Sequence, residues 1–214
     1  MAQVALSKLE EGSSDVDFYN AKVTTTQSQT MYAIKDPLTT NASGALFNAP
    51  RTNACSTGTL SNCFMRITLT DNAGTRTATG LSSTTTDFRT MNGWFADLPN
   101  ASERVDVDPV LYAGTLVYVS NTPSNGGACT TGGSSYINYV NFATGLAVNG
   151  ATNVGGLLSS AGVSSSAALA VTSSGRIVAT TKDSTGKPIT TQLGNLSSPS
   201  GTRRISWRRL TDGS

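Results

Sequence analysis

Short runs of alternating apolar and polar residues, each followed by turn residues, recur along this chain of 214 residues. Residues 64–70 alternate without interruption and end at the Asp-Asn-Ala-Gly turn signal of residues 71–74. Residues 109–120 form the clearest hairpin pattern, in which aromatic and aliphatic residues at strand spacing flank a tight turn around Gly114. Short strands about 8–12 residues apart are typical of sandwiches, barrels and propeller blades. The sequence therefore predicts an all-β protein.

Further strand-like runs extend this prediction over most of the chain. They are residues 22–26, 30–34, 93–98, 135–142, 175–181, 188–193 and 203–210, with a weaker candidate at 167–171. Helical periodicity is almost absent after the N-terminal residues, where a short helix ending near Gly12 is an option. We divide the chain into an N-terminal segment, residues 1–21, and a β-rich domain, residues 22–211. The Gly- and Ser-rich residues 148–174 are interpreted as a long surface loop or insertion.

The composition agrees with this fold class, because 59 residues are Ser or Thr and 21 are Gly, which are poor helix-interior residues. A net charge of +2 argues against a nucleic-acid partner held by bulk charge. The arginines around Trp207 are the one concentrated positive segment, and we interpret them as a final strand whose side-chain stems cover aromatic neighbours. The first residues lack the features of a signal peptide, and no apolar run has the length of a membrane span.

The chain contains no histidine, which excludes imidazole catalysis, the Ser-His-Asp triad and every histidine-containing metal site. Residues 15–20 fit a calcium loop poorly, because Tyr19 occupies the third ligand position and no glycine follows. Asp106 and Asp108 share one face of an extended segment and could serve acid–base chemistry, although a solvated strand face is the favoured interpretation. We therefore predict no catalytic residue, no metal ligand and no cofactor, and favour a binding or structural protein over an enzyme.

Two of the three cysteines suit a disulfide. Cys55 and Cys63 bracket a short polar loop, so a local bond between them is geometrically reasonable. We favour the disulfide over two reduced thiols because the surrounding composition looks extracellular. Cys129 is left over, and either pairs with a cysteine of another chain or is free.

Several segments carry recognisable motifs in a fixed order. Residues 93–111 read Gly-Trp-Phe-Ala-Asp-Leu-Pro-Asn-Ala-Ser-Glu-Arg-Val-Asp-Val-Asp-Pro-Val-Leu, and a hairpin follows at residues 112–123. The next motif holds Cys129 and the Gly-Gly-Ser-Ser-Tyr-Ile of residues 132–137. The flanking motifs are the Gln-Thr-Met-Tyr-Ala-Ile-Lys-Asp of residues 29–36 and the Gly-Thr-Arg-Arg-Ile-Ser-Trp-Arg-Arg-Leu of residues 201–210.

Together these motifs resemble the C-terminal β-propeller domain of the PilY family, which comprises type IV pilus biogenesis factors and tip adhesins. The likeness covers roughly residues 22–210 and is densest over residues 93–137. The chain is far shorter than a full member, has no counterpart of the family's acidic calcium loop, and has Arg209 where the family tends to have Glu. The resemblance implies partial, propeller-like antiparallel sheets and a non-enzymatic role in pilus assembly or surface adhesion. It also implies an extracellular location at the cell surface.

The partners that this resemblance implies are pilin or minor pilin subunits, with copies of the chain itself and a host or surface ligand as further candidates. As a binding surface we single out the aromatic residues Trp94, Tyr112, Tyr118, Tyr136 and Tyr139. Each is equally suited to the core, because alternate strand positions are buried.

Two other functional classes stay open at this point. A structural subunit of an extracellular filament or surface fibre has the same composition, and its open sheet edges would pair between copies. A quinoprotein-like dehydrogenase is the third class, since the family's propeller is similar in shape to such enzymes, but the lack of histidine argues against it.

Overall fold

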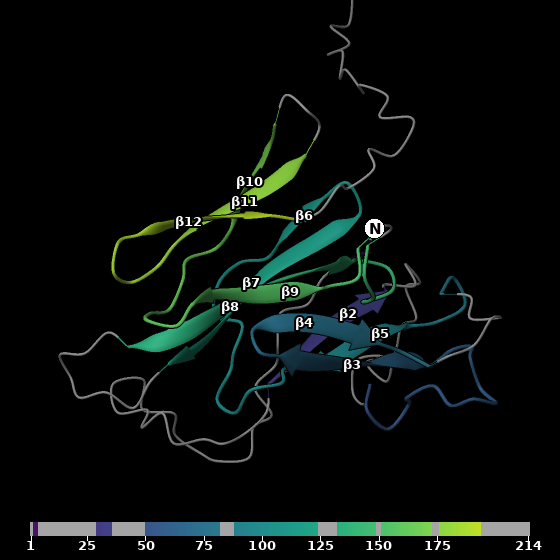
Figure 1. Cartoon of the computed structure of the whole chain (residues 1–214). Coiled ribbons are helices and arrows are strands. Elements are labelled where there is room, and N and C mark those ends of the chain that lie inside the picture. Colours follow the sequence, from purple (N-terminus) through teal and green to yellow (C-terminus); the bar gives the residue numbers. More distant parts are fainter. Residues whose placement is uncertain are drawn as a thin grey trace, which may run out of the picture.

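The computed structural model describes residues 2–3, 29–35, 50–81, 88–123, 132–148, 151–172 and 176–193. Every regular element in these ranges is a β-strand, which confirms the predicted all-β class. The strands form a nine-stranded sheet and a separate three-stranded sheet (Figure 1). Among the described residues there is no helix with the length and apolar character of a membrane span.

The nine-stranded sheet combines strands from both halves of the chain. Its order is β1 (Ala2–Gln3), β2 (Thr30–Lys35), β5 (Gly93–Asp97), β3 (Phe64–Asn72), β4 (Thr75–Thr79), β9 (Gly155–Ser159), β8 (Gly133–Asn141), β7 (Thr115–Pro123) and β6 (Val110–Tyr112). Neighbouring strands are antiparallel except for β3 and β5, which are parallel. The three-stranded sheet has the order β10 (Ala168–Val171), β11 (Ile177–Lys182) and β12 (Pro188–Gln192).

The described strands do not show a propeller. Blades of a propeller are separate four-stranded sheets arranged around a channel. Here β4 pairs with β9, which is far from it in the sequence. This pairing joins strands β1–β5 to strands β6–β9 in one sheet. The all-β part of the fold prediction therefore holds, whereas the propeller-like arrangement has no counterpart in the described ranges.

The core is divided between the two faces of the large sheet. Because successive strand residues point to opposite faces, Leu116 and Tyr118 of β7 enter the main cluster with Trp94, whereas Val117 and Val119 point the other way. The three-stranded sheet covers this second face of β7 and β8 and contributes buried apolar residues from β11 (Figure 1). As a result β7 is buried on both faces from Thr115 to Asn121.

The predicted turns are present where the local pattern was strongest. Ala113 and Gly114 have φ values of 48° and 81°, and Ala73 and Gly74 have φ values of 51° and 88°. Two consecutive positive φ values are the signature of the tight hairpin turn that suits the twist of the flanking strands. The hairpins β6–β7 and β3–β4 follow from these turns.

The loop predicted over residues 148–174 needs correction. Residues 155–159 form β9, which lies between β4 and β8 in the large sheet. Its glycines hide the strand pattern, yet Gly155 is required because an added Cβ would lie 2.5 Å from the Ile137 carbonyl oxygen of β8. The weaker candidate at 167–171 corresponds to β10.

Several predictions fall outside the described residues. They concern the strands at 22–26 and 203–210, the calcium-loop comparison at 15–20, Cys129, and the N-terminal segment 1–21 apart from Ala2–Gln3 in β1.

Candidate functional site

The five aromatic residues proposed as a binding surface occupy different environments. Trp94 and Tyr118 are each 1% exposed, so both belong to the main core and are removed from the candidate surface. The Trp94 indole Nε1 donates a hydrogen bond of 2.9 Å to the Phe142 carbonyl, which satisfies its polar atom inside the core. Tyr139 is half-buried against the second cluster, and burial raises its pKa. Tyr112 is 45% exposed and is the one aromatic of the set that lies largely on the surface.

Tyr136 is held by two charged neighbours rather than offered to a partner. The Arg76 guanidinium lies over its ring at 3.7 Å from the centroid, a cation–π arrangement. Burial raises the pKa of Tyr136, and the hydrogen bond to Asp71 raises it further because it favours the protonated phenol.

Arg76 and Glu103 form an ion pair that is fully buried beneath these residues. Both side chains are 0% exposed, and the pair is bidentate, with Nη1–Oε1 at 2.7 Å and Nη2–Oε2 at 2.8 Å. Arg76 comes from β4, whereas Glu103 follows β5 in the segment of the PilY-like motif. This geometry is the strong, charge-assisted form of the arginine–carboxylate hydrogen bond.

Neighbouring side chains complete the network around the pair. Arg76 Nη1 donates to the Asn138 Oδ1 at 2.8 Å and to the Ser120 hydroxyl at 3.2 Å. The Ser120 hydroxyl donates in turn to Glu103, and the side-chain Nδ2 of Asn100 donates to Glu103 Oε2 at 3.0 Å. The network thus links β4, β7 and β8 to the segment after β5. Within the described ranges, the buried atoms Arg76 Nε and Tyr118 Oη have no hydrogen-bond partner.

These contacts show what the motif residues do in the fold. Glu103 accepts hydrogen bonds from three side chains, Arg76, Ser120 and Asn100, which leaves its carboxylate engaged in structure. Asp97 accepts from Thr30 Oγ1 at 2.6 Å and pairs with Arg51. Partial burial acts to raise the pKa of Asp97, but the hydrogen bonds from Thr30 and Arg51 outweigh it and hold the pKa below its usual value. The motif therefore ties strands together.

The sequence suggested neither the Arg76–Glu103 pair nor its network. The only signal was an arginine in the Thr-rich residues 75–79, and a charged residue inside a short polar run does not predict a buried strand. Asp106 and Asp108 are both exposed, and Asp106 Oδ1 accepts a hydrogen bond of 2.7 Å from the Asn121 side chain. The structure brings no group of three or more potential metal ligands together in the ranges that it describes.

The outer edge of the large sheet is the surface that remains. Strand β6 pairs with β7 on one side, and no described strand is hydrogen-bonded to its other side, although β10 of the small sheet lies near β6. Leu111 is 49% exposed and Tyr112 is 45% exposed there. We call Val110–Tyr112 the β6 edge. An open edge presents unpaired backbone N–H and C=O groups, so it can accept a strand from another chain.

The predicted disulfide is present. The sulfur atoms of Cys55 and Cys63 lie 2.02 Å apart, and their Cα atoms are 5.0 Å apart. The bond closes the polar loop before β3, where Cys63 is 1% exposed.

Comparison with protein-family models, with curated proteins and with solved structures gives no match. In the part of the chain that the structure describes, the fold is all-β, Cys55 and Cys63 form a disulfide, and β6 has no hydrogen-bonded strand on its outer side.

Proposed function

We propose that this protein is a non-enzymatic, extracellular protein that acts in type IV pilus assembly or in adhesion through pili. The PilY-like order of residues 93–111 supports the pilus assignment. The observation that carries a contact function is the β6 edge, because it contains the last residues of this motif and exposes Leu111 and Tyr112.

The disulfide supports the extracellular part of this proposal. Disulfides form and persist in oxidising compartments and are rare in the cytosol. The bond between Cys55 and Cys63 closes a short polar loop, and its presence therefore supports an oxidising, extracellular environment.

The proposed contact is the addition of a strand from a pilin or minor pilin to the β6 edge. Main-chain hydrogen bonds supply affinity in such complexes, and the exposed side chains on the edge supply specificity. Leu111 and Tyr112 are the apolar side chains that such a strand would cover.

The test is cosedimentation of the purified, oxidised full chain with type IV pili sheared from cells. We expect the wild type to sediment with the pili and Leu111→Glu to reduce the bound fraction roughly fivefold, since a charge on an edge opposes strand addition. Leu157→Glu is the matched control, because Leu157 is 44% exposed on β9 inside the sheet, and it should bind like the wild type. Wild-type protein that stays in the supernatant at every pilus concentration would refute the proposal.

The same edge favours a second candidate, a structural subunit of an extracellular filament. In that case the β6 edge pairs with another copy of the chain, and the protein elongates as its concentration rises. Static light scattering over a concentration series separates the two functions. Growth that Leu111→Glu abolishes favours the filament, whereas a constant monomer mass with pilus binding favours the pilus-associated role.

A further inference from the structure

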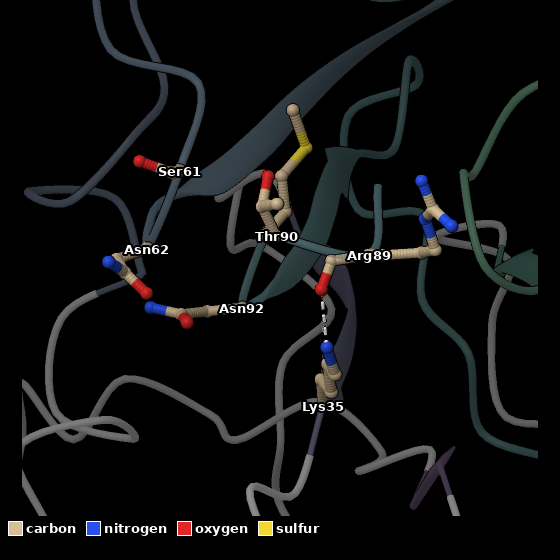
Figure 2. Close-up of a pocket in the computed structure, with 7 residues that line it drawn as sticks. Lys35, Ser61, Asn62, Arg89, Thr90 and Asn92 are labelled. Carbon is tan, nitrogen blue, oxygen red and sulfur yellow. Dashed lines mark hydrogen bonds between the residues drawn. The ribbon is translucent and has the colours of Figure 1, made fainter. Parts of the chain in front are cut away.

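A pocket lies in the large sheet at one end of strands β2, β3 and β5, where three chain segments meet. It has a volume of about 520 Å³ and is lined by Lys35, Ser61, Asn62, Arg89, Thr90, Met91 and Asn92 (Figure 2). Lys35 ends β2, residues 61–62 precede β3, and residues 89–92 precede β5. Because β3 and β5 are parallel and β2 is antiparallel to β5, the C-terminal end of β2 lies beside the N-terminal ends of β3 and β5.

The backbone around the pocket is held in place by hydrogen bonds. The Lys35 N–H donates to the Asn92 carbonyl at 2.7 Å, and the Asn92 N–H donates to the Cys63 carbonyl at 2.9 Å. The Asn62 N–H donates to the Thr90 carbonyl at 2.9 Å. Cys63 is also fixed by its disulfide. The pocket is therefore formed in advance, which reduces the entropy that a ligand must lose on binding.

The chemistry of the lining favours a small anion that carries hydroxyl groups. Lys35 supplies the positive charge at the pocket, whereas the Arg89 guanidinium points away from the other labelled side chains (Figure 2). The Lys35 ammonium donates one hydrogen bond, of 2.6 Å, to the Arg89 carbonyl and keeps two further hydrogens for a ligand (Figure 2). Among the described residues no hydrogen bond is formed by the side-chain amides of Asn62 and Asn92, which point toward each other in Figure 2.

A carboxylate fits this site better than a phosphate does. Phosphate sites in proteins are usually built from free backbone N–H groups at a helix terminus or a glycine-rich loop. Here the N–H groups of Lys35, Asn62 and Asn92 are all used within the sheet. A carboxylate, by contrast, needs only the ammonium of Lys35. Amide side chains both donate and accept hydrogen bonds, as sugar hydroxyls do.

We propose that this pocket binds a carboxylated sugar, with Lys35 taking the carboxylate and Asn62 and Asn92 taking ring hydroxyls. The pocket volume lies within the range of about 300–1,000 Å³ that is typical of small-molecule sites. The inference depends on the pocket alone and not on the pilus, so a protein that binds no pili can still bind the sugar.

The experiment is an NMR titration of the oxidised full chain with sodium D-glucuronate, followed through its backbone amide signals. We expect saturable shifts of Lys35, Asn62 and Asn92. D-Glucose lacks the carboxylate, and acetate lacks the hydroxyls, so each should bind roughly tenfold more weakly, the usual effect of losing one charge-assisted contact. The methyl glycoside of glucuronate, whose anomeric oxygen is blocked as in a polysaccharide, should bind like glucuronate if the natural ligand is a glycan end.

Substitutions place the binding in the pocket. Lys35→Gln should lower glucuronate affinity roughly tenfold, to the level of glucose, and Asn92→Ala should weaken both sugars. Lys187→Gln is the matched control, because Lys187 is an exposed lysine between β11 and β12 of the small sheet, and its affinity should be unchanged. Amide spectra that match the wild type show that each variant is folded. Equal binding of glucuronate and glucose, unchanged affinity of Lys35→Gln, or tighter binding of glucose 6-phosphate would overturn the proposal.

Discussion

At the scale of single residues, the Arg76–Glu103 pair is the most consequential feature of the interior. A buried ion pair repays the cost of desolvation only when its geometry is good and the remaining polar atoms are satisfied. The bidentate contact and the donors Ser120 and Asn100 meet most of this requirement. Removing Glu103 would leave the buried Arg76 with only the longer contact of 3.9 Å to Asp71 to offset its charge.

We therefore expect Glu103→Gln, which keeps the shape of the side chain, to lower the free energy of unfolding by about 3–5 kcal/mol. Urea denaturation measures this change. Asp108→Asn is the control in the same segment, since Asp108 is exposed, and it should stay within about 0.5 kcal/mol of the wild type. The double variant Arg76→Met/Glu103→Leu should lose less free energy of unfolding than the single variants Arg76→Met and Glu103→Leu lose together. Strict additivity would show that the pair is not coupled.

At the scale of elements, the entry into β5 depends on a glycine. Gly93 has a φ of 144°, and an added Cβ would lie 2.0 Å from the Ala33 carbonyl oxygen of β2. Both the backbone conformation and the space exclude other residues. This explains in physical terms why the motif of residues 93–98 begins with glycine.

Gly93→Ala should therefore separate β2 from β5 and lower the free energy of unfolding by more than about 3 kcal/mol. Gly58→Ala is a matched control, because nothing lies within 4 Å of a Cβ added there. Thermal unfolding of the two variants side by side gives the comparison. A Gly93→Ala protein that melts with the control would mean that β2 and β5 shift apart at little cost.

At the scale of the whole molecule, buried polar contacts fasten the small sheet to the large one. The Asn121 side chain of β7 donates to the Ser164 carbonyl at 3.0 Å and accepts from the Ser164 N–H at 2.8 Å. The hydroxyls of Ser135 and Ser164 lie 2.6 Å apart. These contacts fix the residues before β10 beside β7 and β8, where the second apolar cluster forms.

Asn121→Ala should loosen this connection more than it weakens the large sheet. We expect amide hydrogen exchange in β10, β11 and β12 to accelerate roughly 30-fold, which corresponds to about 2 kcal/mol for buried groups left without partners. Amides of β3 and β5 should keep their protection. If all strands lost protection together, the two sheets would unfold as one unit.

The sequence by itself determined the local elements of this protein. The alternation of residues 64–70, the two hairpin turns and the Cys55–Cys63 bond all follow from neighbours in the chain, because they depend on residue spacing and turn chemistry over a few positions. The all-β class follows from the same repeated pattern.

Only the tertiary structure decided which strands pair and which faces are buried. Strand β9 contains Gly155, which becomes necessary only beside β8, and the buried charge of Arg76 is paired with Glu103 from a different segment. Trp94 and Tyr118 are in the core while Tyr112 is exposed, although all three have similar local patterns. The difference arises because burial depends on what covers each face of the sheet, and the strands that provide this cover come from distant parts of the chain.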